Sequence, residues 1–300
     1  TIAFMNTSPD SSLPRNDMYH GQRLVRRFVT LNGVSVALLM DSMLILYAIR
    51  NGVGDSSLAI LASFIHLTMP FVLVGKMLIA RIGAARTWGM GWMLRSTSAG
   101  LLLFAPFLEP HFPQSLQTTV ILLAGFGFAA FRAVGMVGNS PVLGEITDPE
   151  SRGRFLAGNF ARSTTTQLLT LVVVIIVLGS DAETWVYQLV IGFGAALGFY
   201  NGIVVSGVPE SDSPRRSAQI PLGEVLRRVW RQGSMRRLLF AWAAGFAAFT
   251  LVLPFAIITL KNGYGLSDQS ALIFSLIALC GGTVSGIVNG VIADHVGPRP

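Results

Sequence analysis

The sequence predicts an all-α fold, that of a polytopic membrane protein, and three observations carry this prediction. Of the 300 residues, 52% are hydrophobic and only 12% are charged, whereas a soluble domain has about 25% charged residues. Eight apolar stretches each have about 20 residues, the length at which a helix crosses a bilayer. Lys and Arg gather on one side of these stretches, since 18 of the 22 fall on the side of the amino terminus.

The predicted elements follow one another simply along the chain. Residues 1–22 are rich in Ser, Pro, Asp and Asn and are predicted to be a disordered cytoplasmic tail. Residues 23–207 hold six spans, residues 208–235 form a polar linker, and residues 236–300 hold two more spans. The eight predicted spans are Phe28–Ile49, Ser57–Leu78, Thr87–Leu108, Thr118–Ser140, Gly158–Gly179, Trp185–Ser206, Leu238–Leu260 and Ala271–Ala293.

The positive charges set the orientation and account for the net charge. Loops rich in Lys and Arg remain in the cytoplasm, so we expect a cytoplasmic amino terminus in a plasma (inner) membrane. The same distribution explains the net charge of +7, and no nucleic-acid partner is expected. The expected partners are the lipid bilayer and a small-molecule substrate, and the chain is expected to be monomeric. The single cysteine, Cys280, excludes a disulfide within the chain.

The second half of the linker has the pattern of an amphipathic helix. Apolar residues recur at i, i+3, i+4, i+7 and i+8, and they are Leu222, Val225, Leu226, Val229 and Trp230. Arginines occupy the other face, and they are Arg227, Arg228 and Arg231. Such a helix suits the surface of an anionic inner leaflet. We interpret it as a tether between two halves, and a regulatory role is the alternative.

Charged motifs mark three of the predicted cytoplasmic loops. The loop after the fourth span contains Glu145, Pro149-Glu150 and Arg152-Gly153-Arg154. The end of the eighth span contains Gly290, and the loop after it contains Asp294, His295, Gly297 and Arg299. The loop after the second span contains Arg81, Gly83 and Arg86, with Ala80 at the position where the eighth-span copy has its acid.

These motifs resemble those of the major facilitator superfamily. That superfamily carries Gly-x-x-x-Asp-(Arg/Lys)-x-Gly-(Arg/Lys)-(Arg/Lys) after helices 2 and 8, and an acid followed by Pro-Glu and Arg-Gly-Arg after helix 4. The resemblance implies a bundle of two six-helix halves, of which this sequence holds the first half and two helices of an incomplete second half. The repeat is visible in Arg26-Arg27 and Arg236-Arg237, which open apolar runs 210 positions apart.

The resemblance also implies a conformational clamp at the cytoplasmic helix ends. Arg81 would pair with Glu145, and Asp294 would play the acid's part in the other half. Gly83, Gly290 and Gly297 would shape the loops, and Arg152, Arg154 and Arg299 would supply further cations. The alternative is that these cations are ordinary anchors of the positive-inside type, and Lys76 and Arg86 are interpreted in that way.

Four ionisable residues lie within predicted spans, and they are Asp41, His66, Arg95 and Arg132. Each costs about 3 kcal/mol at the middle of a bilayer, so each should face a cavity or a partner. At 1.5 Å per residue, Asp41 and His66 lie about 20 and 18 Å from the cytoplasmic ends of their spans. Arg95 and Arg132 both lie at about 12 Å.

Two hypotheses account for these intramembrane charges. In the first, Asp41 exchanges protons as a coupling site beside His66, and Arg132 presents positive charge to the substrate. In the second, Asp41 forms structural ion pairs with Arg95 or Arg132. Arg95 has the weaker claim to a substrate role, because the resemblance implies that the third helix is mostly peripheral. Two arginines against one acid favour an anionic or zwitterionic substrate.

Other polar and aromatic residues of the spans have two interpretations each. Four amides could bind a polar solute or join helices, and they are Gln167, Gln188, Asn201 and Asn289. Four aromatic residues near span ends are interpreted as interface anchors rather than as a binding cage, and they are Trp92, Trp185, Tyr187 and Trp242.

The function class that the sequence favours is a secondary active transporter working by alternating access, with protons as one candidate for the coupling ion. A membrane enzyme is the least favoured class, because the sequence has no nucleophile motif, nucleotide loop or metal-binding pattern. No cofactor or metal is therefore expected. The remaining alternative is a transporter-derived receptor or scaffold, which binds a solute without moving it.

Overall fold

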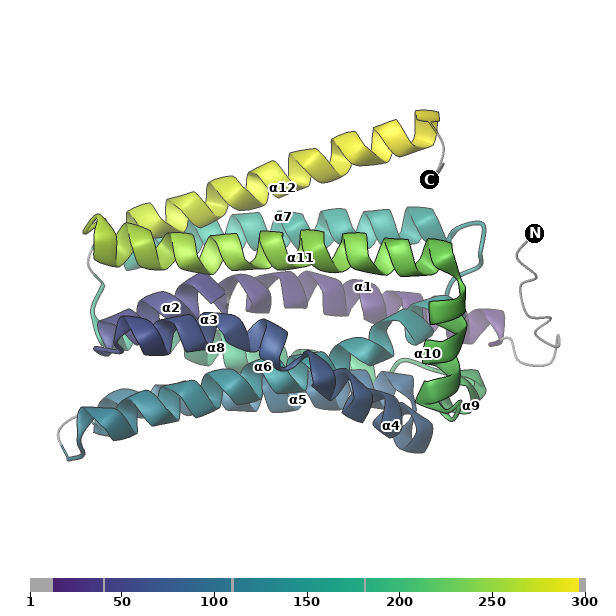
Figure 1. Cartoon of the computed structure of the whole chain (residues 1–300), viewed down its shortest axis with the longest axis horizontal. Coiled ribbons are helices and arrows are strands. Elements are labelled where there is room, and N and C mark those ends of the chain that lie inside the picture. The colour runs from purple at the N-terminus through teal and green to yellow at the C-terminus, as the bar shows by residue number, and fades with distance from the viewer. Residues whose placement is uncertain (1–12, 40, 109–110, 181, 297–300) are drawn as a thin grey trace.

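The computed structural model describes residues 13–39, 41–108, 111–180 and 182–296, and this part of the chain is a bundle of long helices (Figure 1). The elements in chain order are α1 (Arg15–Leu38), α2 (Asp41–Arg50), α3 (Asp55–Leu67), η2 (Met69–Phe71), α4 (Val72–Ile82), α5 (Ala84–Leu101), η3 (Leu102–Leu108), α6 (Gln114–Glu145), α7 (Arg152–Leu178), α8 (Thr184–Ser206), α9 (Ser213–Ala218), α10 (Leu222–Arg231), α11 (Gly233–Ile258), η4 (Thr259–Gly263) and α12 (Asp268–Val296).

All eight predicted spans are helical, which confirms the all-α fold class. Within the described residues, six segments are long and apolar enough to cross a membrane, and they are Arg15–Arg50, Asp55–Ile82, Gln114–Glu145, Arg152–Leu178, Thr184–Ser206 and Asp268–Ser285. Two spans are interrupted near their middles. The first has an irregular backbone at Leu39, where α1 ends, and the second contains η2 with Pro70 near its start, where proline removes a backbone donor.

The predicted disordered tail is wrong for residues 15–22, because α1 already begins at Arg15. Contacts with distant segments hold this first part of the helix. Gly21 packs so closely on Ile146 that an added Cβ would lie 2.7 Å from its Cγ2 atom, and Gln22 Nε2 donates a 2.8 Å hydrogen bond to the Ile146 carbonyl. A polar composition indicates disorder only where such tertiary contacts are missing.

Helix α5 lies between α6 and α8, which both pack along it. Small residues allow this close approach, since a Cβ at Gly91 would lie 2.4 Å from the Cα atom of Gly135 on α6. Most of α5 is therefore buried in protein, including Arg95. Because its buried face packs against protein, α5 can carry Ser, Thr and Arg residues there that a lipid-facing surface would exclude.

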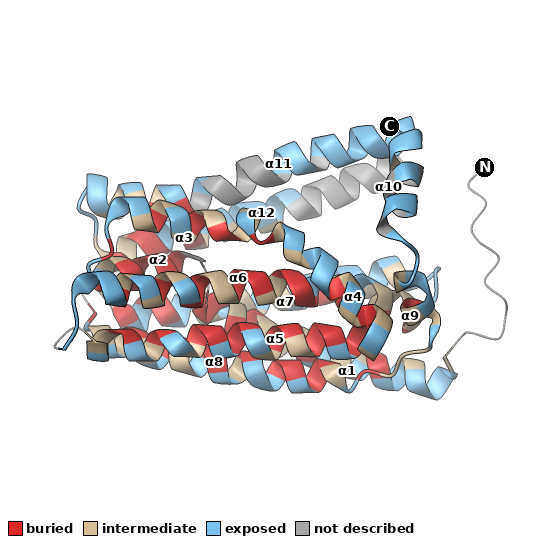
Figure 2. Ribbon diagram, turned by 60° about the horizontal axis from the view of Figure 1, so that its bottom comes forward, coloured by how far each residue is buried: buried red, intermediate tan, exposed pale blue. Residues whose placement is uncertain are grey.

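The outer faces of the bundle are apolar and exposed (Figure 2). On α7 the exposed side chains include Leu169, Val173 and Ile176, and on α8 they include Leu189 and Phe193. A soluble protein rarely leaves so much contiguous apolar surface uncovered, and a bilayer covers it without cost. The burial pattern thus agrees with an integral multi-pass membrane protein.

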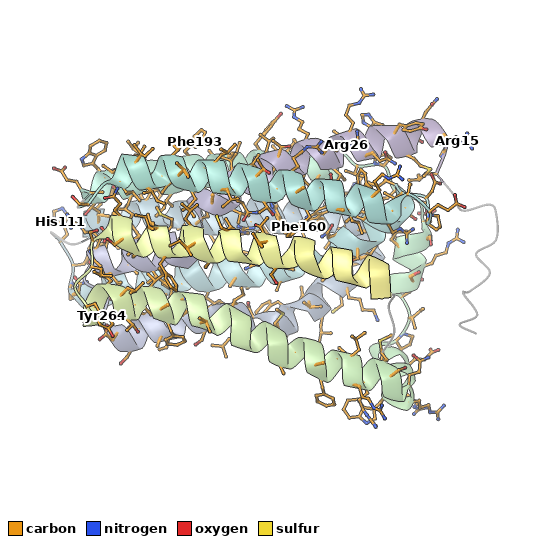
Figure 3. The ribbon with its side chains drawn as sticks, turned by 90° about the horizontal axis from the view of Figure 1, so that it is seen from above. Arg15, Arg26, His111, Phe160, Phe193 and Tyr264 are labelled. Atoms are coloured by element: carbon orange, nitrogen blue, oxygen red, sulfur yellow. The ribbon has the colours of Figure 1, made fainter. Side chains whose placement is uncertain are left out.

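The bundle has two distinct ends. At the arginine-rich end lie the start of α1 and the loop between α6 and α7, together with α9 and α10, and α10 runs across the long axis of the bundle (Figure 1). At the distal end lie His111 and Tyr264, far from Arg15 and Arg26 (Figure 3). Helix α11 packs on α2 and α3, and α12 packs on α7 and α2.

Candidate functional site

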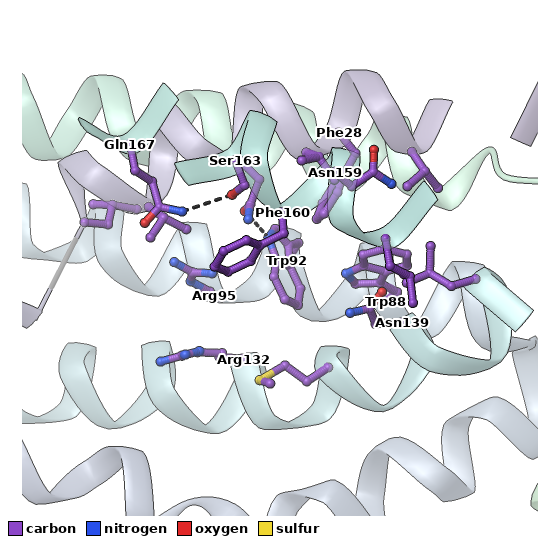
Figure 4. Close-up of a pocket in the computed structure, with 18 of the residues that line it drawn as sticks. Phe28, Trp88, Trp92, Arg95, Arg132, Asn139, Asn159, Phe160, Ser163 and Gln167 are labelled. Atoms are coloured by element: carbon purple, nitrogen blue, oxygen red, sulfur yellow. Dashed lines mark hydrogen bonds between the residues drawn. The ribbon is translucent and has the colours of Figure 1, made fainter. Parts of the chain in front are cut away.

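A cavity of about 440 Å³ lies between α1, α5, α6 and α7 (Figure 4). Its lining begins near the arginine-rich end, at Val25, Leu143 and Leu156, and extends to Leu39 and Gln167 in mid-span. In the described part of the chain, the lining does not continue beyond Leu39, Arg95, Phe128 and Gln167 toward the distal ends of the four helices. All of the described lining residues belong to the first six spans.

Two predicted site residues, Arg95 and Arg132, both line the cavity. Arg95 is only 5% exposed, and its guanidinium lies over the rings of Phe128 at 4.4 Å and Trp92 at 5.4 Å from their centroids. Such cation–π contacts stabilise a desolvated guanidinium. Arg132 is partly exposed and also borders a smaller cavity against α3. The expectation of a peripheral third helix is therefore wrong for the position of Arg95.

Aromatic rings form much of the remaining wall. Phe28 contacts Trp88 edge to face at 4.7 Å and Trp92 at 5.7 Å between ring centroids, and the two tryptophans are 6.2 Å apart. The Trp92 Nε1 donates a 2.8 Å hydrogen bond to the side-chain oxygen of Asn32 on α1. Edge-to-face contacts of this kind fix the orientation of the rings.

The interpretation of four aromatic residues as interface anchors needs two corrections. Trp92 is only 8% exposed and lines the cavity, and Tyr187 is fully buried between the halves. Trp185 is 55% exposed and binds Glu183 at the distal end, as an anchor would, while the side chain of Trp242 lies outside the described residues. The sequence contained a pattern that indicates a shared position for these residues, because Trp88, Trp92 and Arg95 recur at i, i+4 and i+7 on one helix face.

The four amides divide between the cavity and the helix contacts. Gln167 lines the cavity and donates a 3.0 Å hydrogen bond to Ser163. Gln188 donates to the Leu103 carbonyl at 2.7 Å, and Asn201 donates to the Phe28 carbonyl at 3.2 Å, so both of these join helices. The side chain of Asn289 lies outside the described residues.

The other two intramembrane residues remain apart from this cavity. Asp41 begins α2, directly after the interruption of the first span, and its side chain lies outside the described residues. His66 sits near the end of α3, is partly buried, and lines neither this cavity nor the smaller one. The prediction of a coupling role for Asp41 and His66 stays a prediction.

Hydrogen bonds across the two halves close the distal end. Tyr187 of α8 donates its hydroxyl to Asp268 of α12 at 2.7 Å, and Asp268 also forms an ion pair with Lys261 of η4. Ser42 of α2 and Ser275 of α12 share a buried hydrogen bond of 2.9 Å. With Asp268 only 2% exposed, these contacts exclude water, so the second half is locked to the first at this end.

At the arginine-rich end, the loop between α6 and α7 is held by its own side chains. Arg152 donates to the carbonyls of Gly144 at 2.9 Å and Thr147 at 3.2 Å, as a cation placed at the carboxyl end of a helix does. Glu145 accepts hydrogen bonds from the amide and the hydroxyl of Ser211, after α8. The predicted ion pair of Arg81 with Glu145 is not formed among the described side chains, and both Arg81 and Arg154 are exposed.

The carboxylate of Glu210, which follows α8, contacts the loop after the second span. Both the Ala84 and Ala85 amides donate to Glu210 Oε2, at 2.7 and 2.9 Å, so Glu210 caps the amino terminus of α5. Gly83 has a φ of +97°, and a Cβ there would lie 1.8 Å from Glu210 Oε1. A glycine is needed at this position for both reasons. Glu210 thus brings an acid to the motif copy that has Ala80.

The second copy of this motif lies at the end of the described chain. The backbones of Gly290 and Asp294 belong to α12, and their side-chain environment lies outside the described residues, as do Gly297 and Arg299 entirely. Within the described part, no group of three or more His, Cys, Asp or Glu residues could hold a metal ion.

The comparisons with known proteins agree with this architecture. No curated protein sequence is similar enough to count as a match. A sequence model described as Major Facilitator Superfamily matches residues 28–300. Because this match covers most of the chain and the matched region is a bundle of membrane-length helices, the protein belongs to the major facilitator superfamily of membrane transporters.

Proposed function

We propose that the protein is a secondary active transporter that moves a small anionic or zwitterionic solute by alternating access, with the arginine-rich end in the cytoplasm. One observation carries the proposal, namely that the cavity and the interhalf contacts lie toward opposite ends of the bundle. The cavity lining starts near the arginine-rich end, while Tyr187, Asp268 and Lys261 close the distal end. This arrangement fits an inward-facing state.

Alternating access requires a second state in which the distal contacts open and the arginine-rich end closes. The contacts at the two ends differ in the way this requires. Distal contacts join the first half to α12, whereas Glu145 and Glu210 bind residues within the first half and its linker. Only the distal contacts must break when the halves rock.

A reversible crosslink between the halves tests the proposal. In a Cys280→Ser background, cysteines replace Ser42 and Ser275, whose hydroxyl oxygens are 2.9 Å apart and suit a disulfide after small adjustments. Reconstituted protein is screened for counterflow with labelled small organic anions, zwitterions and neutral solutes. We expect oxidation of the double variant to abolish counterflow and reduction to restore it.

The single variants Ser42→Cys and Ser275→Cys serve as controls, and oxidation should leave both active. Counterflow that continues in the crosslinked protein would contradict alternating access at this interface. Solute binding without counterflow in the unmodified protein would favour the receptor or scaffold class instead.

Proton coupling through Asp41 is the finer part of the proposal. Support comes from its place within the first membrane-length segment, Arg15–Arg50, since carboxylates inside membranes commonly mark proton pathways. An Asp41→Asn protein should still exchange substrate in counterflow but should lose accumulation driven by a pH gradient. Full accumulation in that variant would rule out Asp41 as the coupling site.

A further inference from the structure

We infer that the cavity binds a compact organic anion with a flat apolar ring, of the arylcarboxylate class, with its charged group toward Arg132 and its ring against the tryptophans. The inference deepens the proposed transport function and rests on it for everything that follows binding. Three properties of the wall lead to it, which are its charge, its hydrogen-bonding atoms and its rings.

The charge of the wall is positive. Arg95 and Arg132 line the cavity, and no Asp or Glu belongs to the described lining. Figure 4 places both arginine side chains in the same part of the cavity, with Phe160 and Trp92 beside Arg95. Because Arg132 remains partly exposed in the lining and like charges repel, the described wall favours an anion and disfavours a cation.

Hydrogen-bonding side chains in the lining suit the same kind of ligand. The amides of Asn139, Asn159 and Gln167 and the hydroxyl of Ser163 belong to the cavity wall. Amide and hydroxyl groups donate hydrogen bonds to acceptor oxygens, so a ligand that carries such oxygens, as a carboxylate does, has donors to meet in this wall.

The rings and the size of the cavity define the rest of the ligand. Phe28, Trp88 and Trp92 present a fixed edge-to-face cluster, and Phe160 lies 58% exposed opposite Trp92 across the lining. A volume of about 440 Å³ is near the lower end for small-molecule sites. Phe28, Trp88 and Trp92 are only 2–8% exposed, so the uncovered apolar surface of the wall is mainly that of Phe160. An inorganic anion would leave this surface bare, whereas one or two fused rings would cover it and the accessible edge of Trp92.

Equilibrium binding to the purified full-length protein tests the inference. Benzoate and 2-naphthoate are titrated by calorimetry beside three comparison probes, namely the neutral amide benzamide, the cation benzylammonium and the ringless anion acetate. We expect both aryl carboxylates to bind at least about tenfold more tightly than any comparison probe, as a charge-assisted hydrogen bond implies.

Two matched variants assign the site. Arg132→Gln should remove the preference for carboxylate over amide, and Arg132→Lys should keep part of it. Arg162→Gln changes an exposed arginine on α7 that does not line this cavity, and it should bind like the unmodified protein. Thermal denaturation of each variant shows that it is folded before its affinity is compared.

Several results would overturn the inference. The first is that neither aryl carboxylate binds. The second is that benzamide, benzylammonium or acetate binds as tightly as the aryl carboxylates. The third is that Arg132→Gln and Arg162→Gln lose the same amount of affinity for the aryl carboxylates. Failure of the two proposals is distinguishable, because binding in detergent requires no transport. Bound benzoate without counterflow of any solute contradicts only transport, while counterflow of another solute without arylcarboxylate binding contradicts only the inference.

Discussion

The two ends of the bundle use polar side chains in opposite ways. At the distal end, a few buried groups join the two halves, with Asp268 receiving both Tyr187 and Lys261. At the arginine-rich end of the described chain, Glu145 and Glu210 form hydrogen bonds only between the first half and the linker that follows it. The comparison teaches that the distal contacts set the conformational state, whereas the arginine-rich contacts set the shape of the first half.

The largest effect is expected for Asp268→Ala. This change removes the carboxylate that accepts from Tyr187 of the first half and pairs with Lys261, and breaking a buried ion pair costs about 3–5 kcal/mol. The Lys261 ammonium would lie unpaired at the closed interface and gain water when that end opens, so the inward-facing state should be destabilised and the distal end should open. A cysteine in place of the buried Ser275, in a Cys280→Ser background, should react with an impermeant maleimide at least about tenfold faster.

Ser270→Ala is the matched control for Asp268→Ala. Ser270 lies on the same helix and bonds Ser267 rather than the first half, so its removal should leave the labelling rate unchanged. Equal acceleration in both variants would mean that any damage to the start of α12 opens the distal end, and the comparison of the two ends would fail.

The next effect is expected at the other end, for Gly83→Ala. The new Cβ would collide with Glu210, and the φ of +97° strains any other residue. Backbone strain of this kind costs about 1–3 kcal/mol. The variant should unfold at a lower temperature in detergent, while the distal labelling rate stays the same because the two halves do not meet at Gly83.

Glu210→Gln sharpens the same test. A glutamine can still accept from the Ala84 and Ala85 amides, so only the charge is lost, and the cap should weaken by about 1 kcal/mol or less. A larger loss for Glu210→Gln than for Gly83→Ala would contradict the assignment of Glu210 as a cap.

A smaller effect is expected for Tyr187→Phe. This substitution removes one hydrogen bond to Asp268 but keeps the ring and the Lys261 ion pair. A hydrogen bond to a charged carboxylate contributes about 1.5 kcal/mol or more, so labelling at position 275 should accelerate about tenfold. An acceleration as large as that of Asp268→Ala would assign the whole lock to the tyrosine instead of the carboxylate.

The helical segments could be predicted because they follow from local properties of the sequence. Apolar length predicted eight stretches that are all helical, and six of the described segments are long and apolar enough to cross a membrane, where a helix satisfies its own backbone. The gathering of Lys and Arg on one side of the predicted spans can also be read directly from the local sequence. The depth estimate also brought Arg95 and Arg132 to one level, and both line the same cavity.

The hydrogen-bond partners of the polar residues could not be predicted from the sequence, because they depend on contacts between distant segments. Glu210 meets Ala84 across 126 positions, and Asp268 meets Tyr187 across 81. Trp92 was misjudged for the same reason. Its distance from the span end suggested an anchor, whereas the packing of Gly91 on Gly135 turns that face of α5 into the protein.

The smallest effect is expected for Asn262→Ala. Asn262 donates to Asp55 between η4 and α3, and this distal contact is exposed to solvent. Exposed polar pairs contribute about 0–1 kcal/mol, so labelling at position 275 should change by no more than about fivefold. Asp55→Ala removes the same pair from the other side and should give the same small change.

The contrast between Asn262→Ala and Asp268→Ala isolates the role of burial at the distal end. Both variants break a contact of the η4 region, and the side chains differ chiefly in exposure, since Asp268 is 2% exposed and Asn262 is solvent-facing. If Asn262→Ala opens the distal end as far as Asp268→Ala does, the exposed and the buried distal contacts set the conformational state together. If only Asp268→Ala opens it, the buried carboxylate holds the distal end closed, because polar interactions are stronger in a desolvated environment.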